Sequence, residues 1–250
     1  MKLKEIADYV EAHLRVREIP DSSLNGVQVE NSGEVRKIAS AVDISLETVR
    51  RAAEAGADLI LVHHGLFWKQ PIAAAGRYYP IFKTLFDHNI ALIAEHLPLD
   101  VHSELGNNAL IAKVLGLKTG PVFGSPGGMA IIQSGTYDAP VSVETFLATF
   151  EKAVGKPLAF TSNGKKTVSK IGIVSGGGNF AVEEAARAGC DLFVTGDASH
   201  TVYHPARELG ISVLAGGHYA TEVFGVRALG EHLSKKFGLS AEFLDIPTGL

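Results

Sequence analysis

The chain has 250 residues, of which 46% are hydrophobic and 20% are charged, as is usual for a globular protein. Its formal net charge of −4 provides no general field that would attract nucleic acid or an acidic membrane surface. The single cysteine, Cys190, excludes an intrachain disulfide and a thiolate metal cluster and fits a reducing compartment. We therefore expect a cytoplasmic protein whose partners include neither membranes nor nucleic acid.

The first 14 residues predict an amphipathic helix rather than the apolar core of a signal peptide, because their apolar side chains recur at helical spacing. A turn-rich stretch, IPDSSLNG at 19–26, follows this helix. The next segments are KIASAVD, LETVRRAAEAG and DLILVHH, which predict a strand, a helix and a strand over residues 37–64. The strand segments are short and continuously apolar, as is typical of parallel strands that helices cover on both faces.

The same alternation continues with YYPIFKTLFDHN and IALIAE, and it returns from VSKIGIVSG to the end of the chain. Alternating strands and helices predict an α/β fold. Residues 37–64 also align without a gap to residues 170–197, with nine of the 28 pairs identical. Similar composition could explain this match, but the following strands, 90–95 and 211–216, continue it, so we interpret it as an internal repeat.

We therefore predict two structurally related α/β halves, residues 1–122 and 123–250, with mainly parallel sheets. Residues 118–168 lie between the repeated parts and contain GPVFGSPGG, a strand-like segment, a helix-like segment and a Gly/Lys turn. This stretch predicts a short linking segment of βαβ type.

Histidines and acids follow three of the predicted strands directly. His63 and His64 end DLILVHH, His96 and Asp100 follow IALIAE, and His218 and Glu222 follow ISVLAGG. Because the carboxyl ends of parallel strands share one edge of a sheet, these groups can converge on a ligand. The sequence therefore predicts a metal site at the strand ends, formed where the second half returns its histidine and glutamate to the first.

Each member of this set has a simpler explanation when it is taken alone. A lone histidine is more often an ordinary core or surface group, and Asp100 could cap a helix that begins near Val101. It is the repeated occurrence of histidine and acid at matching strand ends that favours metal binding.

Adjacent residues on a strand point in opposite directions, so one ion would not easily bind both His63 and His64. Two divalent ions could bind one imidazole each, with carboxylates bridging them. Nitrogen and oxygen ligands without thiolate suit zinc, manganese, iron or magnesium at a site with open coordination positions. For His96 we expect a role in proton transfer or in supporting a ligand.

The motifs LVHHG, EHLPLD, TGD and GGHYATE, in this order along nearly the whole chain, resemble the Nif3-like family filed as GTP cyclohydrolase I type 2 homologues. The resemblance implies a homohexamer in which each chain binds two divalent ions. It also implies five ligands: His63, His64, Asp100, His218 and Glu222. The middle segment is too short for the extra domain that longer family members carry.

If the site is catalytic, metal-activated water makes hydrolysis the natural reaction, with a nucleotide-like or other phosphorylated small molecule as substrate. The label GTP cyclohydrolase comes from the resemblance alone. A different class of function also fits the sequence: a non-enzymatic assembly or regulatory protein that its metals only stabilise.

The main competing motif is IVSGGGNFAVEEA, in which Gly176, Gly178 and Ala181 match a dinucleotide-binding pattern, with Asp197 as the acidic residue that follows. This interpretation leaves the histidine motifs unexplained. The loop could instead bind a substrate phosphate through backbone N–H groups, or it could be a tight turn.

The loop GLFWKQPIAAAGRYYP, residues 65–80, carries Trp68, Arg77, Tyr78 and Tyr79 directly after the histidine pair. These side chains could stack on a nucleobase. Aromatic packing at a domain or subunit contact explains them as well, and we favour the packing explanation.

Overall fold

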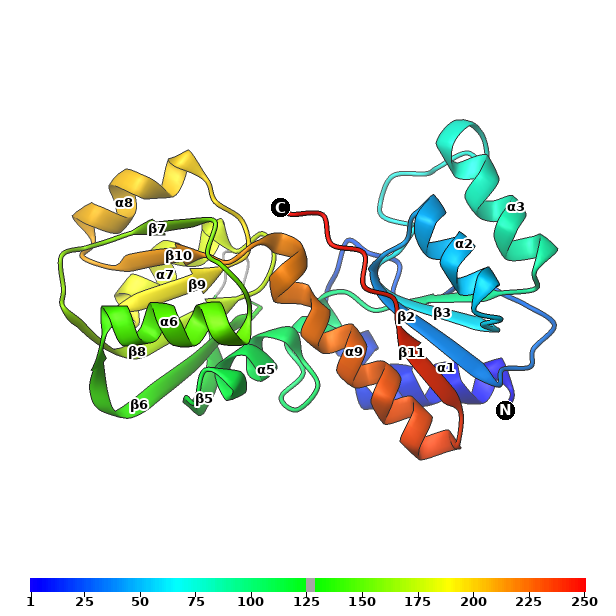
Figure 1. Cartoon of the computed structure of the whole chain (residues 1–250), viewed down its shortest axis with the longest axis horizontal. Coiled ribbons are helices and arrows are strands. Elements are labelled where there is room, and N and C mark those ends of the chain that lie inside the picture. Colours follow the sequence, from blue (N-terminus) through cyan, green and yellow to red (C-terminus); the bar gives the residue numbers. More distant parts are fainter. Residues whose placement is uncertain (125–128) are drawn as a thin grey trace. The chain divides into compact units, whose positions relative to one another are not determined.

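The computed structural model describes residues 1–124 and 129–250, which form two compact α/β units with one sheet each (Figure 1). The first unit comprises Met1–Leu99 and Gly225–Ile246, and the second comprises Asp100–Phe224 and Pro247–Leu250. The α/β class and the arrangement in two related halves are as the sequence predicts.

The unit boundaries differ from the division at residue 122 that we expected. Strand β11 (Ser240–Phe243), close to the end of the chain, pairs in parallel with β2 (Lys37–Asp43) and so belongs to the first sheet. Strand β5 (Lys118–Phe123) pairs with β6 (Ile132–Ser142) in the second sheet. Pairing between residues far apart in the sequence therefore sets the units, and neither unit coincides with one continuous half.

The first sheet has the order β1-β4-β3-β2-β11. Its strands β4, β3, β2 and β11 run parallel to one another. Strand β1 (Gly26–Val29) pairs antiparallel with β4 (Ala91–Ala94) at the edge. Every residue of β4 is buried, as are all residues of β3 (Leu59–His64) except the last. Continuous burial explains the unbroken apolar runs in the sequence, because helices cover both faces of parallel strands.

Helices α2 (Leu46–Glu54) and α3 (Tyr79–Asp87) lie side by side against this sheet (Figure 1). Ser45 caps α2 by accepting the N–H of Thr48, and Gly56, with φ +67°, follows its end. The other helical segments that begin in the first unit are α1 (Leu3–His13), η1 (Val16–Glu18), η2 (Gly76–Tyr78) and the short α4 (Leu97–Asp100).

The second sheet has the order β5-β6-β8-β9-β10-β7. Its centre is parallel and consists of β8 (Thr167–Val174), β9 (Leu192–Thr195) and β10 (Ser212–Ala215). Antiparallel strands flank this centre, with β6 beside β8 and β7 (Ala159–Thr161) beside β10. The linking segment expected at residues 118–168 thus extends both edges of the second sheet, and its residues 125–128 lie outside the described residues.

The helical segments of the second unit connect these strands, and α9 runs from the second unit into the residues of the first. They are α5 (Asn107–Val114), α6 (Val143–Ala153), η3 (Asn179–Ala181), α7 (Val182–Arg187), η4 (His200–Val202), α8 (Tyr203–Glu208) and α9 (His218–Phe237).

The internal repeat extends to individual hydrogen bonds. Asp58 accepts the backbone N–H of Lys37 at 3.0 Å in the first unit, and Asp191 accepts that of Lys170 at 3.1 Å in the second. The strand register also matches, since Ile38 pairs with Leu59 and Ile171 pairs with Leu192. Asp58 therefore fixes the start of β2 against β3, and Asp191 fixes the start of β8 against β9. This shared role explains why the two aligned positions hold the same residue.

Within the described ranges, no helix combines the length and the apolar character needed to cross a membrane.

Candidate metal centre

Three histidines come together at the strand ends of the first unit. His63 and His64 are the last residues of β3, and His96 follows β4. One ring nitrogen from each lies within 4.8 Å of the others. His63 is fully buried, and His64 retains 20% of its side-chain exposure. The sequence therefore located a cluster of imidazoles that is compact enough to hold a cation.

The imidazole rings of the adjacent residues His63 and His64 lie closer together than the alternation of side chains along a strand predicts. The rings of His63 and His64 are 4.7 Å apart between centroids, with planes inclined at 51°. Alternation separates side chains along a regular strand, but His64 is the final residue of β3, where the strand ends. Both imidazoles therefore reach the same side of the strand end.

An oxygen acceptor orients each imidazole of the cluster through its Nδ1 atom. His63 donates to the backbone carbonyl of Glu95 at 2.9 Å, and His64 donates to Oδ1 of Asp43 at 2.8 Å. His96 donates to the carboxylate of Asp21, with the shorter distance 3.0 Å. Hydrogen bonds of this type fix the tautomer of a ligating histidine and present Nε2 to the metal.

Asp21 is a functional residue that the sequence analysis missed. Its side chain is 3% exposed, and it also accepts the backbone N–H of Leu97 at 2.9 Å. Burial alone would raise the pKa of Asp21, but hydrogen bonds from His96, Asn25 and Ser23 outweigh it and hold the pKa well below its usual range. The carboxylate is therefore a fixed negative charge beside His96. The only signal in the sequence was the turn-forming stretch around it.

Glu95 adds a second buried acid to the first unit. Its side chain is 1% exposed, and burial, reinforced by the charges of Glu11 and Asp21, raises its pKa to about 8. At neutral pH the carboxyl group is therefore mostly protonated. It adds little negative charge to the histidine cluster, while its backbone carbonyl positions His63.

In the second unit, His218 and Glu222 meet on the first turn of α9. His218 Nε2 is 3.2 Å from Oε2 of Glu222, and its Nδ1 donates to Oδ1 of Asp197 at 2.8 Å. The hydrogen bond with Glu222 is the main cause that raises the pKa of His218 to about 9, against an opposing effect of burial. Glu222 is 3% exposed. A divalent cation could take the place of the proton that these two side chains share.

Asp100 is buried at the end of α4, where it is 5% exposed. It accepts hydrogen bonds from Nδ2 of Asn107 at 2.8 Å and from Oγ of Ser175 at 3.0 Å. The alternative that Asp100 caps the next helix does not hold, because α5 begins at Asn107 with Gly106 as its N-cap. Asn107 and Ser175 therefore hold the carboxylate in place, which suits a ligand.

The Gly176–Gly178 loop is a tight turn that lies against His218 and Glu222. A Cβ atom on Gly176 would lie 2.1 Å from Oε1 of Glu222, and the residue has φ +58°. The N–H of Gly176 donates to Thr221 Oγ1, and that of Gly178 donates to Thr195 Oγ1. These bonds use two of the loop N–H groups that could have bound a phosphate. Of the three interpretations of this motif, the structure favours the tight turn.

Asp197 does not favour the dinucleotide interpretation either, since its carboxylate is bonded to His218. The pairing of His218 with Asp197 resembles that of His64 with Asp43, since both histidines follow their aspartate by 21 residues, but the internal repeat does not align the two pairs. Each unit therefore presents at least one imidazole that an aspartate orients.

The donor atoms of each unit are of the chemical types that bind divalent cations. The first unit offers imidazole nitrogens, and the second offers an imidazole and two carboxylates. This mixture suits zinc, iron or manganese. Loading by a divalent metal therefore agrees with the chemistry of the residues present.

Comparison with known proteins places these residues in a family context. The model of the Duf34/NIF3 (NGG1p interacting factor 3) family matches residues 1–248. The chain is 41% identical over 246 residues to a Deinococcus radiodurans protein named GTP cyclohydrolase 1 type 2 homolog, covering 98% of this chain and 94% of that protein. A Pyrococcus horikoshii protein of the same name is also 41% identical, with 100% of both chains covered.

Solved structures show the same fold. The protein ybgI, described as of unknown function, superposes with a TM-score of 0.94 at 36% identity, and TTHA1606 from Thermus thermophilus does so with 0.90 at 39%. Both matches cover 100% of each chain. Reduced HcgD from Methanocaldococcus jannaschii gives a TM-score of 0.85 at 28% identity, covering 98% of each chain.

Proposed function

The chain belongs to the Duf34/NIF3 family, and on this premise we propose that it is a metal-dependent hydrolase of a nucleotide-like or other phosphorylated small molecule. The proposed ligands of two divalent ions are His63, His64, Asp100, His218 and Glu222. The supporting observation is the orientation of the imidazoles, since an aspartate carboxylate or a backbone carbonyl fixes Nδ1 of each one. Side chains held in this way are ready to bind metal without rearrangement.

When bound, a pair of divalent ions supplies Lewis-acid activation of water and of the bond to be cleaved. The residues of the chain determine the rest of the chemistry. His63 in the first unit and Asp100 and Glu222 in the second are each buried, so bulk water has little access to these side chains. We assign proton transfer to His96, whose Nδ1 is bonded to the ionised carboxylate of Asp21 while Nε2 is the atom that can hold a proton.

The relatives' shared name, GTP cyclohydrolase 1 type 2 homolog, makes GTP one member of the substrate panel. We also propose a cytoplasmic homohexamer, on the basis of the sequence pattern and the family resemblance.

The test is a turnover assay with the full chain loaded in turn with zinc, manganese, iron(II) and magnesium. The substrates are nucleoside triphosphates including GTP, nucleoside monophosphates and simple phosphoesters. We expect hydrolysis with at least one metal, its loss in His64→Ala, and its retention in His88→Ala, which changes an exposed histidine at the end of α3. Metal binding without turnover on the whole panel would instead favour the non-enzymatic, metal-stabilised protein.

A further inference from the structure

The first unit contains a pocket of about 370 Å³ that starts at the residues directly after Asp43 and His64. Ile44 and Gly65 line it, and the N–H of Ile44 donates to the carbonyl of His64 at 3.0 Å. This volume lies within the usual range for sites that bind small molecules. The pocket therefore lies next to the histidine cluster without including its ring nitrogens.

The walls of the pocket are mostly apolar, and one of them is aromatic. Leu66 and Ile81 contribute buried aliphatic surface, while Trp68 is 36% exposed. The Trp68 ring lies 5.0 Å from His96 and 6.1 Å from His64 between centroids, so it is a wall shared by the pocket and the histidine cluster. A planar ring could stack on this indole.

Trp68 is held in position before any ligand binds. Its Nε1 donates to the carbonyl of Gly65 at 3.1 Å, and a bridge to Ser23 holds its backbone. Gln28 Oε1 accepts the N–H of Leu66 at 2.7 Å, which fixes the start of the same loop. The indole face is therefore a rigid surface, and little conformational entropy is lost when a ligand contacts it.

Arg77 gives the pocket its charge. It is the only charged residue among the described residues that line the pocket, and no carboxylate in the described ranges lies within ion-pair distance of it. Its guanidinium lies 4.5 Å above the Tyr78 ring and donates to the Tyr78 hydroxyl at 2.7 Å. This contact orients the planar group and leaves further N–H donors for an anion.

We propose that this pocket binds the substrate through a planar heteroaromatic ring stacked on Trp68 and an anionic group paired with Arg77. A mononucleotide has both features. The assignment rests on the proposed hydrolase function, because it names the part of the substrate that is recognised beside the metal ligands. It also revises our preference for the packing explanation of the 65–80 loop, since part of the Trp68 face is exposed to the pocket.

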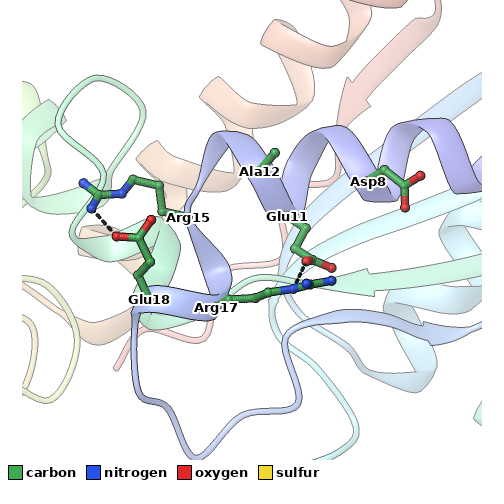
Figure 2. Close-up of a pocket in the computed structure, with 6 residues that line it drawn as sticks. All are labelled: Asp8, Glu11, Ala12, Arg15, Arg17 and Glu18. Carbon is green, nitrogen blue, oxygen red and sulfur yellow. Dashed lines mark hydrogen bonds and ion pairs between the residues drawn. The ribbon is translucent and has the colours of Figure 1, made fainter.

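A second hollow in the described residues fits an anionic ligand less well. The hollow of about 350 Å³ along α1 is lined by Arg15, Arg17, Glu11 and Glu18, and these side chains pair with one another (Figure 2). Paired charges leave no net cation for an anionic ligand. Arg77 differs because no acid neutralises it.

Trp68 is the single tryptophan of the chain, so its fluorescence reports directly on the pocket. The full chain is titrated, as purified and again after chelation, with AMP, GMP, adenosine and ribose 5-phosphate. We expect the two mononucleotides to change the fluorescence, adenosine to bind at least about tenfold more weakly, and ribose 5-phosphate to have the smallest effect. In Arg77→Gln, AMP should bind no more tightly than adenosine does to the wild type. Arg36→Gln, a change to an exposed arginine of the same unit outside the pocket, should stay within about twofold of the wild type.

The pocket assignment is overturned if AMP at millimolar concentration leaves the fluorescence unchanged, if ribose 5-phosphate binds as tightly as AMP, or if Arg77→Gln binds AMP like the wild type. These outcomes are separable from failure of the proposed function. If AMP binds in a way that depends on Arg77 but no substrate is turned over, the pocket assignment is supported and the proposed hydrolase function is contradicted. If the chain turns over a substrate and Arg77→Gln has the same KM as the wild type, the pocket assignment is contradicted and the hydrolase function is not.

Discussion

The carboxylate of Asp43 accepts a hydrogen bond of 2.8 Å from Nδ1 of His64, and the two residues are cross-strand partners at the ends of β2 and β3. The second unit has a similar bond of the same length between Asp197 and His218. Each unit thus contains an imidazole oriented by an aspartate, although the internal repeat aligns Asp43 with Gly176 and His64 with Asp197. This repeated contact explains why the proposed site needs residues that do not themselves bind the metal.

Replacing Asp43 with asparagine should weaken metal binding about 10- to 100-fold, because the tautomer and orientation of His64 are no longer fixed by a carboxylate. The measurement is a competitive titration of zinc or manganese against a chelator of known affinity. Asp87→Asn, which changes an exposed acid on α3, is the matched control and should bind like the wild type. Equal affinities for Asp43→Asn and the wild type would show that the carboxylate does not position His64.

Replacing Gly176 with alanine should impair metal binding as well as stability. The new Cβ would lie 2.1 Å from Glu222 Oε1 and 2.9 Å from His218 Nε2, so both side chains must move. Gly189→Ala is the control, since Gly189 also has positive φ but no atom within 4 Å of the added Cβ. Both variants should lose about 1–2 kcal/mol of stability from backbone strain. Thermal unfolding together with metal titration separates the effects, and a Gly176→Ala variant with wild-type affinity would contradict the close packing described here.

The buried carboxyl group of Glu95 predicts a pH-dependent gain in stability for Glu95→Gln. The pKa of Glu95 is about 8 in the folded chain and close to the ordinary value of 4.5 in the unfolded chain. Folding therefore requires proton uptake between these values, and the wild type loses stability as the pH rises from about 4.5 to 8. The variant avoids this loss, so its advantage should grow over that range to about 5 kcal/mol and then stay constant.

Thermal unfolding of the chelated protein from pH 5 to pH 9 measures this difference. Glu30→Gln, at an exposed glutamate, should follow the wild type at every pH. A constant difference between Glu95→Gln and the wild type across the range would mean that Glu95 does not bind a proton on folding.

Metal binding should strengthen as the pH rises towards 9, because a cation must displace the proton from His218. The hydrogen bond with Glu222 raises the pKa of His218 to about 9, so the imidazole is protonated at neutral pH in the absence of metal. Below pH 9 the affinity should fall by up to about tenfold for each pH unit. Titrations in non-coordinating buffers at pH 6.5, 7.5, 8.5 and 9.5 test this trend. The same affinity at pH 7.5 and pH 8.5 would contradict the assignment of His218 as a ligand.

The sequence predicted the parallel centre of each sheet and the residues at the strand ends, because both depend on local patterns. Continuous apolar runs marked β3 and β4, and His63 and His64 followed at the strand end. The aligned Asp58 and Asp191 indicated the repeat, which the matching hydrogen bonds now explain.

The remaining features depend on contacts between distant parts of the chain. Asp21 lies in an irregular turn, 75 residues from the His96 side chain that it orients, and no periodic pattern marks it. The pairing of β11 with β2 likewise joins residues about 200 positions apart, which is why the unit boundaries could not be found from sequence halves. Asp197 was visible in the sequence, but a dinucleotide motif suggested a different role until its bond with His218 was seen.

The most direct test of the account is the metal content of the purified chain, measured by elemental analysis with a parallel titration of affinity. The wild type should bind two divalent ions per chain, and His64→Ala and Glu222→Gln, one change in each unit, should both bind fewer ions or bind them much more weakly. His88→Ala should match the wild type. If both ligand variants retained the stoichiometry and affinity of the wild type, His64 and Glu222 would not be ligands and the proposed metal centre would be wrong.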